Sequence, residues 1–293
     1  MIKMENVSKS YNGKKALEEV NITLSAGEIH GLVGNNGAGK TTLIKCLAGI
    51  YKADSGSVTC EDKNIYSNPK LKEKIGYVSD ANDYIVGYTI SKMLKLYEKG
   101  FSKFDVTKFY EMNEKFKLDT RMKIESLSKG QKMRFGFMLE LSKKPEYLLM
   151  DEPTSGLDPI AKKRFFDILI DEVERENIGV LISSHNLNDL EKLCDTITIL
   201  EEGKVFNNSS LDELKNSLTK LQIVFDNGVD RKMLLRNTVK KCTNIGNIYT
   251  LVIEDYDGDK EKWLKKLGAS YIEVLDMSFE ELYITLKERE GEK

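Results

Sequence analysis

Gly34-Asn35-Asn36-Gly37-Ala38-Gly39-Lys40-Thr41 follows a short, mainly apolar run at residues 29–33 and precedes a segment with apolar residues at helical spacing, residues 43–50. The octapeptide has the form Gly-x-x-x-x-Gly-Lys-Thr, which average residue usage produces by chance in about one per cent of chains of this length. Glycines allow the backbone to wrap closely around a phosphate, so that successive N–H groups point at the anion. The helix that follows adds its unpaired N–H groups and the positive end of its dipole. The octapeptide therefore predicts a strand, a phosphate-binding loop and a helix in succession.

Two side chains of this loop have specific roles in nucleotide binding. Lys40 would reach the β- and γ-phosphates, and the Thr41 hydroxyl would ligate Mg²⁺. We therefore expect a nucleotide phosphate to bind here. The predicted phosphate-binding residues are Gly34, Asn35, Asn36, Gly37, Ala38, Gly39, Lys40, Thr41 and the neighbouring Thr42.

A pair of carboxylates, Asp151 and Glu152, follows the continuous apolar segment at residues 147–150. Such a segment is typical of a strand in the middle of a parallel sheet that is covered on both faces. A carboxylate at the end of that strand, beside a phosphate loop, can hold Mg²⁺ through water. The carboxylate of the next residue can orient and polarise the attacking water. Together with the phosphate loop, the pair predicts nucleotide hydrolysis, with Asp151 at the metal and Glu152 as the base.

Composition limits the class of protein and its partners. The chain has 293 residues, enough for one large domain or two smaller ones, and a formal net charge of −2, so we expect no nucleic-acid partner. No apolar run approaches the roughly 20 residues that span a bilayer. Residues 1–5 begin a strand-like pattern and lack the apolar core of a signal peptide. We expect a cytoplasmic protein whose membrane role, if it has one, depends on a partner.

The cysteines and histidines form no cluster with the spacing of a zinc site or a disulfide framework. We expect the cysteines to be reduced and mostly buried, and His30 to be structural. The cysteines are Cys46, Cys60, Cys194 and Cys242, and the only histidines are His30 and His185.

The order of the predicted elements indicates an α/β fold in the first part of the chain. Strands alternate with helices through residue 207, which favours a core around a mainly parallel sheet. Residues 2–25 predict two strands joined at Asn12-Gly13, and residues 89–118 have a helical pattern. From residue 208 the pattern changes to that of a small α+β unit. We therefore expect two domains, residues 1–207 and 208–293.

Residues 1 to about 207 resemble the nucleotide-binding subunits of ATP-binding-cassette (ABC) transporters. Besides the phosphate loop, Leu127-Ser128-Lys129-Gly130-Gln131 is similar to the family signature, and Ser155-Gly156-Leu157-Asp158 is similar to the loop after the catalytic carboxylate. The resemblance implies a phosphate-loop ATPase core with an antiparallel β subdomain and a helical subdomain. It also implies a head-to-tail dimer around two Mg-ATP molecules. Each ATP would contact the phosphate loop of one subunit and the signature helix of the other.

The resemblance assigns the signature residues to ATP binding. Ser128, Gly130 and Gln131 would form the partner's half of the site, because the start of a helix offers N–H groups to the γ-phosphate. His185 lies at the position of the family's switch histidine, and it would contact the γ-phosphate as a second catalytic residue.

Two further residues have a nucleotide-binding role by resemblance and a plain structural alternative. Tyr11 would stack on the adenine, and the alternative is an ordinary aromatic residue of a hairpin. Asp158 would bridge to the opposite subunit's phosphate loop, and the alternative is a helix-capping aspartate before Pro159.

The chain departs from the family pattern at two positions. Asp80 follows Ile75-Gly76-Tyr77-Val78-Ser79, where the family usually carries glutamine. A carboxylate can also ligate Mg²⁺, so Asp80 joins Thr41 and Asp151 as a predicted metal ligand, although it adds negative charge beside the phosphates. Lys129 occupies the third signature position, where glycine is common.

These observations predict an ATP-hydrolysing subunit that drives a separate transmembrane permease from the cytoplasmic face of the membrane. It would dimerise with a second copy or with a paralogue, and residues 80–100 would contact the permease. The ending at residues 277–283 resembles the tails of members that serve exporters of drugs or peptide antibiotics. Import by the same ATPase is one alternative, and a soluble mechanochemical ATPase acting on nucleic acid or the ribosome is another. Residues 208–293 could also form a sensing or dimerising module.

Overall fold

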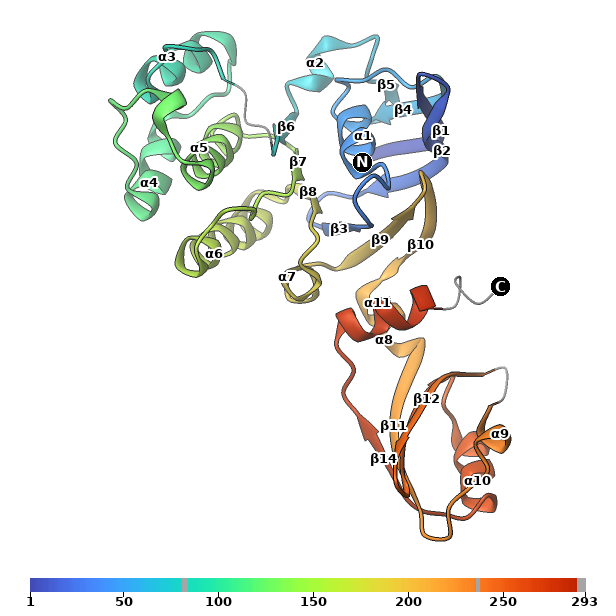
Figure 1. The fold of residues 1–293 in the computed structure, drawn as a ribbon. Coiled ribbons are helices and arrows are strands. Elements are labelled where there is room, and N and C mark those ends of the chain that lie inside the picture. The colour runs from blue at the N-terminus through green and yellow to red at the C-terminus, as the bar shows by residue number, and fades with distance from the viewer. Residues whose placement is uncertain (81–83, 236–237, 289–293) are drawn as a thin grey trace. The chain divides into compact units, whose positions relative to one another are not determined.

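The computed structural model describes residues 1–80, 84–235 and 238–288. The chain divides into two compact units, Met1–Asn208 (the N-terminal unit) and Ser209–Lys293 (the C-terminal unit). Figure 1 shows the elements of both units. In the described part of the chain, no helix is both long enough and apolar enough to cross a bilayer.

A six-stranded sheet forms the centre of the N-terminal unit. Strand β3 pairs in parallel with β8 and β9, and β7 pairs in parallel with β6 and β8. Every residue of β3, β7 and β8 is buried, as expected for a parallel sheet that is covered on both faces. In spatial order the strands are β10 (Lys204–Ser210), β9 (Thr196–Glu201), β3 (Ile29–Val33), β8 (Gly179–Ser183), β7 (Tyr147–Asp151) and β6 (Ile75–Val78). The carboxyl ends of the parallel strands therefore share one edge, and the phosphate loop and Asp151 lie at that edge.

An antiparallel sheet stands beside the central sheet, with helix α1 (Lys40–Leu47) between them (Figure 1). The turn at Asn12-Gly13 joins its first two strands, as the sequence predicts. Leu43, Ile44 and Leu47 of α1 pack into a core that both sheets contribute to. In spatial order the strands are β2 (Lys14–Leu24), β1 (Ile2–Tyr11), β4 (Ser55–Cys60) and β5 (Lys63–Asn64).

The helices α3 (Ile90–Gly100), α4 (Val106–Phe116) and α5 (Lys129–Leu141) gather at one side of the N-terminal unit (Figure 1). The sequence predicted helix through residues 89–118, whereas the structure has a break between α3 and α4. The Asp105 side chain accepts a hydrogen bond from Lys108 N at 3.1 Å and caps α4, which starts a new helix. The remaining helices are α2 (Pro69–Lys72), the 3-10 helix η1 (Ile124–Ser126), α6 (Pro159–Glu176) and α7 (Leu187–Glu191).

The C-terminal unit is a four-stranded antiparallel sheet with helices, in agreement with the α+β prediction. Leu234 of α9 and Leu264 of α10 pack against Leu221, Ile223 and Phe225 of the sheet. The sheet order is β12 (Val239–Ile245), β13 (Ile248–Glu254), β11 (Leu218–Phe225) and β14 (Ala269–Leu275), and the helices are α8 (Leu211–Asn216), α9 (Arg231–Leu234), α10 (Gly258–Lys266) and α11 (Phe279–Glu288). The sequence did not predict β12, because this edge strand buries only Cys242 and carries no apolar alternation.

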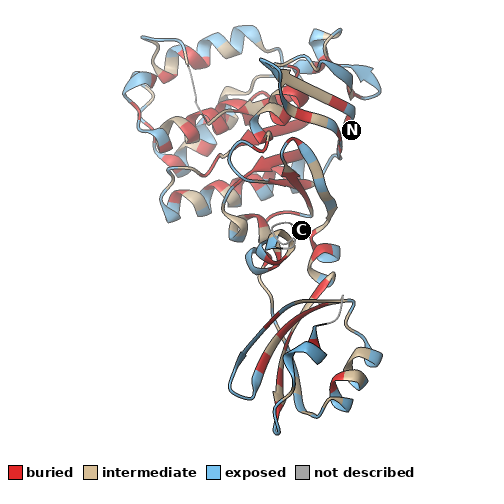
Figure 2. Ribbon diagram, turned by 45° about the vertical axis from the view of Figure 1, so that its right-hand side comes forward, coloured by how far each residue is buried: buried red, intermediate tan, exposed pale blue. Residues whose placement is uncertain are grey.

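Burial follows the layers of the two units (Figure 2). The central strands are the most continuously buried segments, and all four cysteines are buried and free of disulfides. His30 is also buried, and its Nε2 lies 2.7 Å from Thr198 Oγ1 on the neighbouring strand, which is a structural contact.

Leu149→Ala tests the central position of β7, because the Leu149 side chain is 0% exposed. The substitution should lower the free energy of unfolding by about 2–5 kcal/mol, because it leaves a cavity in a packed layer. Leu96→Ala, at a side chain that is 42% exposed, is the matched control and should change it by about 0.5 kcal/mol or less. Urea unfolding of the two variants measures the difference, and equal midpoints would contradict the burial.

Candidate active site

The phosphate loop runs from the end of β3 to the start of α1. Gly39 is the N-cap of α1 and has φ 107°, and a Cβ there would lie 2.4 Å from Ala16 O. Glycine is therefore required at this position for both conformation and space. The Lys40 Nζ donates to Gly34 O at 2.6 Å and lies 3.3 Å from Asn35 O. The ammonium group thus lies within the curve of the loop, where it can meet an anion.

A pocket of about 570 Å³ opens at this loop. Asn35, Asn36, Gly37 and Ala38 line one side of it, and the other lining residues are Lys14, Lys15, Leu200, Glu201 and Glu202. Sequence reasoning did not find the two lysines. They follow the Asn12-Gly13 turn, which brings the start of β2 to the loop.

The ends of β7 and β8 and the start of α1 are joined by hydrogen bonds at the carboxyl edge of the sheet. Thr41 Oγ1 donates to Asp151 Oδ2 at 2.6 Å, and Ser183 Oγ donates to Asp151 Oδ1 at 2.8 Å. The backbone N–H of Glu152 donates to the same Ser183 Oγ at 3.0 Å. Ser183 therefore positions both acidic residues. Its signal in the sequence is a polar residue at the end of an apolar strand.

Glu152 and His185 lie side by side. Glu152 Oε2 is 2.7 Å from His185 Nδ1 and 3.4 Å from the backbone N of His185. Glu152 has φ 49°, in the left-handed region that non-glycine residues rarely occupy. The Glu152 side chain is 19% exposed and the His185 side chain 71% exposed. The carboxylate is thus held in a fixed direction, and the imidazole remains open to solvent.

The start of α5 has a capping box. Ser128 Oγ accepts from Gln131 N at 3.2 Å, and Gln131 Oε1 accepts from Ser128 N at 2.9 Å. A Cβ on Gly130 would lie 2.5 Å from Gly156 O, so glycine is needed there for the close approach of two backbones. Within the described residues, the hydrogen bonds and ion pairs of Ser128, Lys129 and Gln131 do not reach residues 34–42. These bonds therefore do not link the two predicted phosphate-binding segments within one chain.

The remaining predicted residues have identifiable neighbours. Asp158 Oδ1 accepts from Ile160 N at 3.0 Å and Ala161 N at 2.9 Å, so it caps α6. The bond from Ala161 N–H holds the pKa of Asp158 below its usual range. Tyr11 is 42% exposed. Its ring lies edge to face with the ring of Tyr51, and the two ring centroids are 6.1 Å apart.

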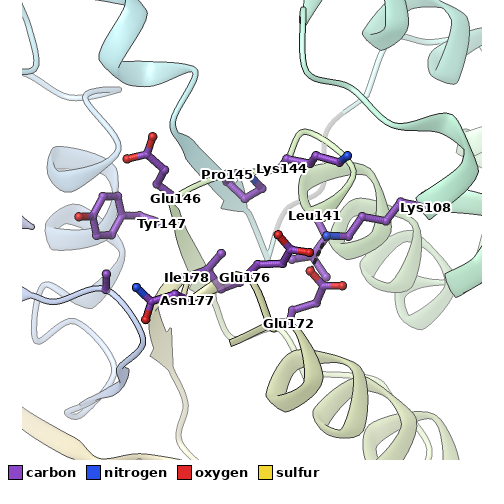
Figure 3. Close-up of a pocket in the computed structure, with 11 residues that line it drawn as sticks. Lys108, Leu141, Lys144, Pro145, Glu146, Tyr147, Glu172, Glu176, Asn177 and Ile178 are labelled. Atoms are coloured by element: carbon purple, nitrogen blue, oxygen red, sulfur yellow. Dashed lines mark hydrogen bonds and ion pairs between the residues drawn. The ribbon is translucent and has the colours of Figure 1, made fainter. Parts of the chain in front are cut away.

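A second pocket, of about 280 Å³, lies where β7 and β8 begin (Figure 3). An ion pair between Lys108 and Glu172 lies at this pocket, and Tyr147 and Ile178 also line it. It therefore lies at the amino edge of the sheet, opposite the edge that carries the phosphate loop, and it takes no part in the chemistry of that loop.

The comparisons with known proteins agree with this geometry. A sequence model of the ABC transporter family matches residues 17–155. The ABC transporter ATP-binding protein YtrB of Bacillus subtilis (strain 168) is 32% identical over 284 residues, which are 97% of this chain and 97% of YtrB. The chain belongs to the ABC transporter family. It is an ATP-binding, ATP-hydrolysing subunit with the phosphate-loop ATPase fold that the sequence predicted.

Other ABC proteins are also similar, some over part of the chain and some over nearly all of it. The bacitracin transport ATP-binding protein BcrA of Bacillus licheniformis is 33% identical over 73% of this chain and 71% of its own length. The methionine import ATP-binding protein MetN of Clostridioides difficile (strain 630) is 29% identical over 98% of this chain and 97% of its own. The dimeric structure of MJ0796, a bacterial ABC transporter cassette, superposes with a TM-score of 0.65 at 25% identity, over 72% of this chain and 99% of MJ0796.

The residues of this ABC subunit fit the Mg²⁺ that ATP carries. Mg²⁺ is usually bound by one or two protein ligands together with phosphate oxygens and water. Thr41 Oγ1 and Asp151 Oδ2, 2.6 Å apart, are two such oxygens beside the loop. Among the described residues, no group of three His, Cys, Asp or Glu could hold a metal ion alone. The Thr41–Asp151 pair is a donor set that fits Mg²⁺ bound together with phosphate oxygens.

Ser183→Ala tests the role of the hydroxyl that joins Asp151 to Glu152. It should lower the kcat of ATP hydrolysis about ten-fold or more, the value of one hydrogen bond to a charged group. Ser126→Ala removes an exposed hydroxyl that donates to Lys123 O at 2.7 Å, and it should leave kcat unchanged. Steady-state phosphate release measures both variants, and an unchanged kcat in Ser183→Ala would show that the hydroxyl does not position the carboxylates.

Proposed function

We propose that this ABC subunit hydrolyses Mg-ATP between two copies of itself, or between itself and a paralogue, and thereby drives a separate transmembrane permease as an exporter. The observation that carries the proposal is the arrangement at the carboxyl edge of the sheet. There the phosphate loop, the Thr41–Asp151 contact and the Glu152–His185 contact lie together. Such a set of groups can bind a triphosphate, hold its metal and activate a water molecule.

The chain's own residues would divide the reaction as follows. Lys40 and the N–H groups of residues 34–42 bind the phosphates. Thr41 and Asp151 would hold Mg²⁺, which would neutralise phosphate charge when bound. Asp80 stays a predicted metal ligand, although its carboxylate lies against Lys129 in this structure. Glu152 accepts a proton from the water that attacks the γ-phosphorus, and ADP leaves.

His185 would assist this step from beside the base. Its Nδ1 lies against Glu152 Oε2, so the contact fixes the direction of both side chains. Because the imidazole is largely exposed, it can contact a γ-phosphate that is bound at the loop.

The second copy would supply the other half of each site. Ser128, Gly130 and Gln131 do not reach the phosphate loop of their own chain, which favours a role opposite the partner's ATP. The dimeric MJ0796 structure is support from a relative. Asp158 would face the partner's phosphate loop through Oδ2, because its cap bonds use Oδ1. Tyr11 would stack on the adenine from the hairpin that borders the pocket.

The proposal includes a direction of transport, which is export. The relative BcrA is named for bacitracin transport and MetN for methionine import, so import remains the alternative.

The match to YtrB extends over 97% of both chains, so it includes the C-terminal unit. We assign it an accessory role beside the catalytic domain, which we place at residues 1–207, with residues 208–293 as the accessory domain. A soluble ATPase acting on nucleic acid or the ribosome is less well supported than a transporter subunit. YtrB and MetN, which align over nearly their whole lengths, are named as an ABC transporter protein and an import protein.

The permease would contact the segment at residues 80–100, and through it the subunit would lie on the cytoplasmic face of the membrane. Residues 81–83 of this segment lie outside the described residues. In the remainder, Ile85 is 49% exposed, Val86 is 83% exposed and Leu96 is 42% exposed. Exposed apolar side chains that are close in sequence are typical of a protein interface.

Glu152→Gln tests the base and the dimer together. The amide keeps the size of the side chain but cannot accept the proton, so turnover should fall about 100-fold or more. ATP binding should persist, and the variant should form a dimer with ATP in size-exclusion chromatography. Near-normal turnover would refute Glu152 as the base, and a strictly monomeric ATP-bound variant would refute the shared site.

Lys40→Ala should weaken ATP binding about ten-fold or more, because it removes a charge-assisted contact from the loop. It should also abolish the ATP-dependent dimer. Lys52→Ala, at an exposed lysine beyond α1, is the control and should bind ATP normally. Unchanged affinity in Lys40→Ala, measured by equilibrium binding, would count against the phosphate-loop assignment.

Val86→Asp tests the permease contact. It should reduce the amount of co-purifying membrane protein while ATP binding is unchanged, because a charge is costly at an apolar interface. Ile245→Asp, at a side chain that is 86% exposed in the C-terminal unit, is the matched control. Co-purification from solubilised membranes with mass spectrometry gives the readout, and equal recovery with both variants would argue against residues 84–100 as the docking surface.

A further inference from the structure

The two departures from the family pattern contact each other. Lys129 Nζ lies 2.6 Å from Asp80 Oδ1, and it also donates to Ser155 Oγ at 3.1 Å. The Lys129 side chain is 51% exposed and the Asp80 side chain 46% exposed. Lys129 is the first residue of α5, Asp80 follows β6, and Ser155 lies in the loop before α6. One side chain thus joins three segments that are far apart in the sequence.

The topology places this ion pair beside the nucleotide site. Val78, at the end of β6, is paired with Met150 of β7, so Ser79 and Asp80 follow β6 at the edge of the sheet where Asp151 ends β7. The carboxylate of Asp80 therefore belongs to the edge of the sheet that carries the phosphate loop. A negative charge at this edge repels the phosphates of ATP unless a cation balances it.

A second contact joins α5 to the same strand. Glu140 Oε2, near the end of α5, accepts from Tyr77 N at 3.0 Å and from Lys143 Nζ at 2.7 Å. This contact is buried, whereas the contact between Lys129 and Asp80 is half exposed. Helix α5 is thus joined at its end to β6 and at its start to the residues that leave β6. The buried contact fixes the helix. The half-exposed pair places the positive charge of Lys129 beside the carboxylate of Asp80.

We propose that Lys129 and Asp80 act as one unit in ATP hydrolysis, with Lys129 as a positioning residue that neutralises Asp80 and holds it at the edge of the site. The inference rests on the proposed function, because it places the triphosphate at the phosphate loop. The family's usual pair, glutamine and glycine, has no net charge, and the pair in this chain also has none. The two substitutions therefore compensate each other, and either one alone changes the charge that faces ATP.

A double-mutant cycle tests this charge balance. Lys129→Met leaves the Asp80 carboxylate unbalanced, so the KM and Kd for Mg-ATP should rise about two- to five-fold, the range of a partly exposed ion pair. With Asp80 paired to Lys129 and not bound to Mg²⁺, Asp80→Asn leaves an extra positive charge, so both constants should fall by a similar factor. The double variant should return to the wild-type values, and Lys129→Arg should retain them. The changes should appear in KM and Kd more than in kcat, and should shrink at high ionic strength.

The ion pair of Lys123 and Glu125 provides the matched control. Its atoms are 3.5 Å apart and its side chains are 61% and 45% exposed, close to the values of the proposed pair. Lys123→Met and Glu125→Gln should leave the KM and Kd for Mg-ATP unchanged.

The signs of the shifts separate the proposal from a purely structural contact. A structural contact would make both single variants worse in the same direction, and residues whose charges do not act on ATP would leave the KM and Kd unchanged in both. Either result would overturn the proposal. Failure of the proposed function would look different, since a wild-type chain that bound ATP without hydrolysing it would still give the Kd cycle.

Discussion

The hydrogen bond from Thr41 to Asp151 is the contact on which the site of this ABC subunit depends. It joins the first turn of α1 to the last residue of β7, and buried apolar residues of both elements belong to one core cluster. Because β3, β7 and β8 are parallel, the loop after β3, the acidic residues after β7 and Ser183 at the end of β8 all reach one edge. The topology brings the groups together, and the hydrogen bonds of Thr41 and Ser183 then set their directions.

Glycine residues allow a second kind of closeness, between backbone segments. Gly130 lets the start of α5 approach the carbonyl of Gly156, and Gly39 lets the phosphate loop approach Ala16. The approach of Gly130 to Gly156 links the signature residues at the start of α5 to the loop that follows Glu152. The signature motif therefore has a structural requirement within one chain, besides the role that the dimer would give it. The capping box of Ser128 and Gln131 is part of the same requirement, because it fixes where α5 begins.

Short-range patterns predicted the local elements that carry the candidate site. The phosphate loop, the strand before Asp151 and the Asn12-Gly13 hairpin each depend on neighbours in the sequence, so residue types and spacing were sufficient. The contact of Ser183 with Asp151 and the contact of Lys129 with Asp80 depend on strand order and helix packing, which no local pattern encodes. The same reason explains β12, an edge strand with one buried side chain. In the sequence, Asp80 and Lys129 are two separate departures from the family pattern, and the fold shows that their side chains are in contact.

The four acidic residues that are predicted for the nucleotide site share one property that follows from their chemistry. Carboxylates beside a triphosphate are unfavourable unless each has a partner. Asp151 accepts from Thr41 and Ser183, and Glu152 contacts His185. Asp158 accepts from two backbone N–H groups, and Asp80 contacts Lys129. The partners of Asp151, Glu152 and Asp158 are neutral donors or a histidine, which suits groups that must bind a metal, take a proton or cap a helix. Asp80 alone of the four has a lysine, and this full charge balance is what an additional carboxylate needs at a position where a neutral side chain is usual.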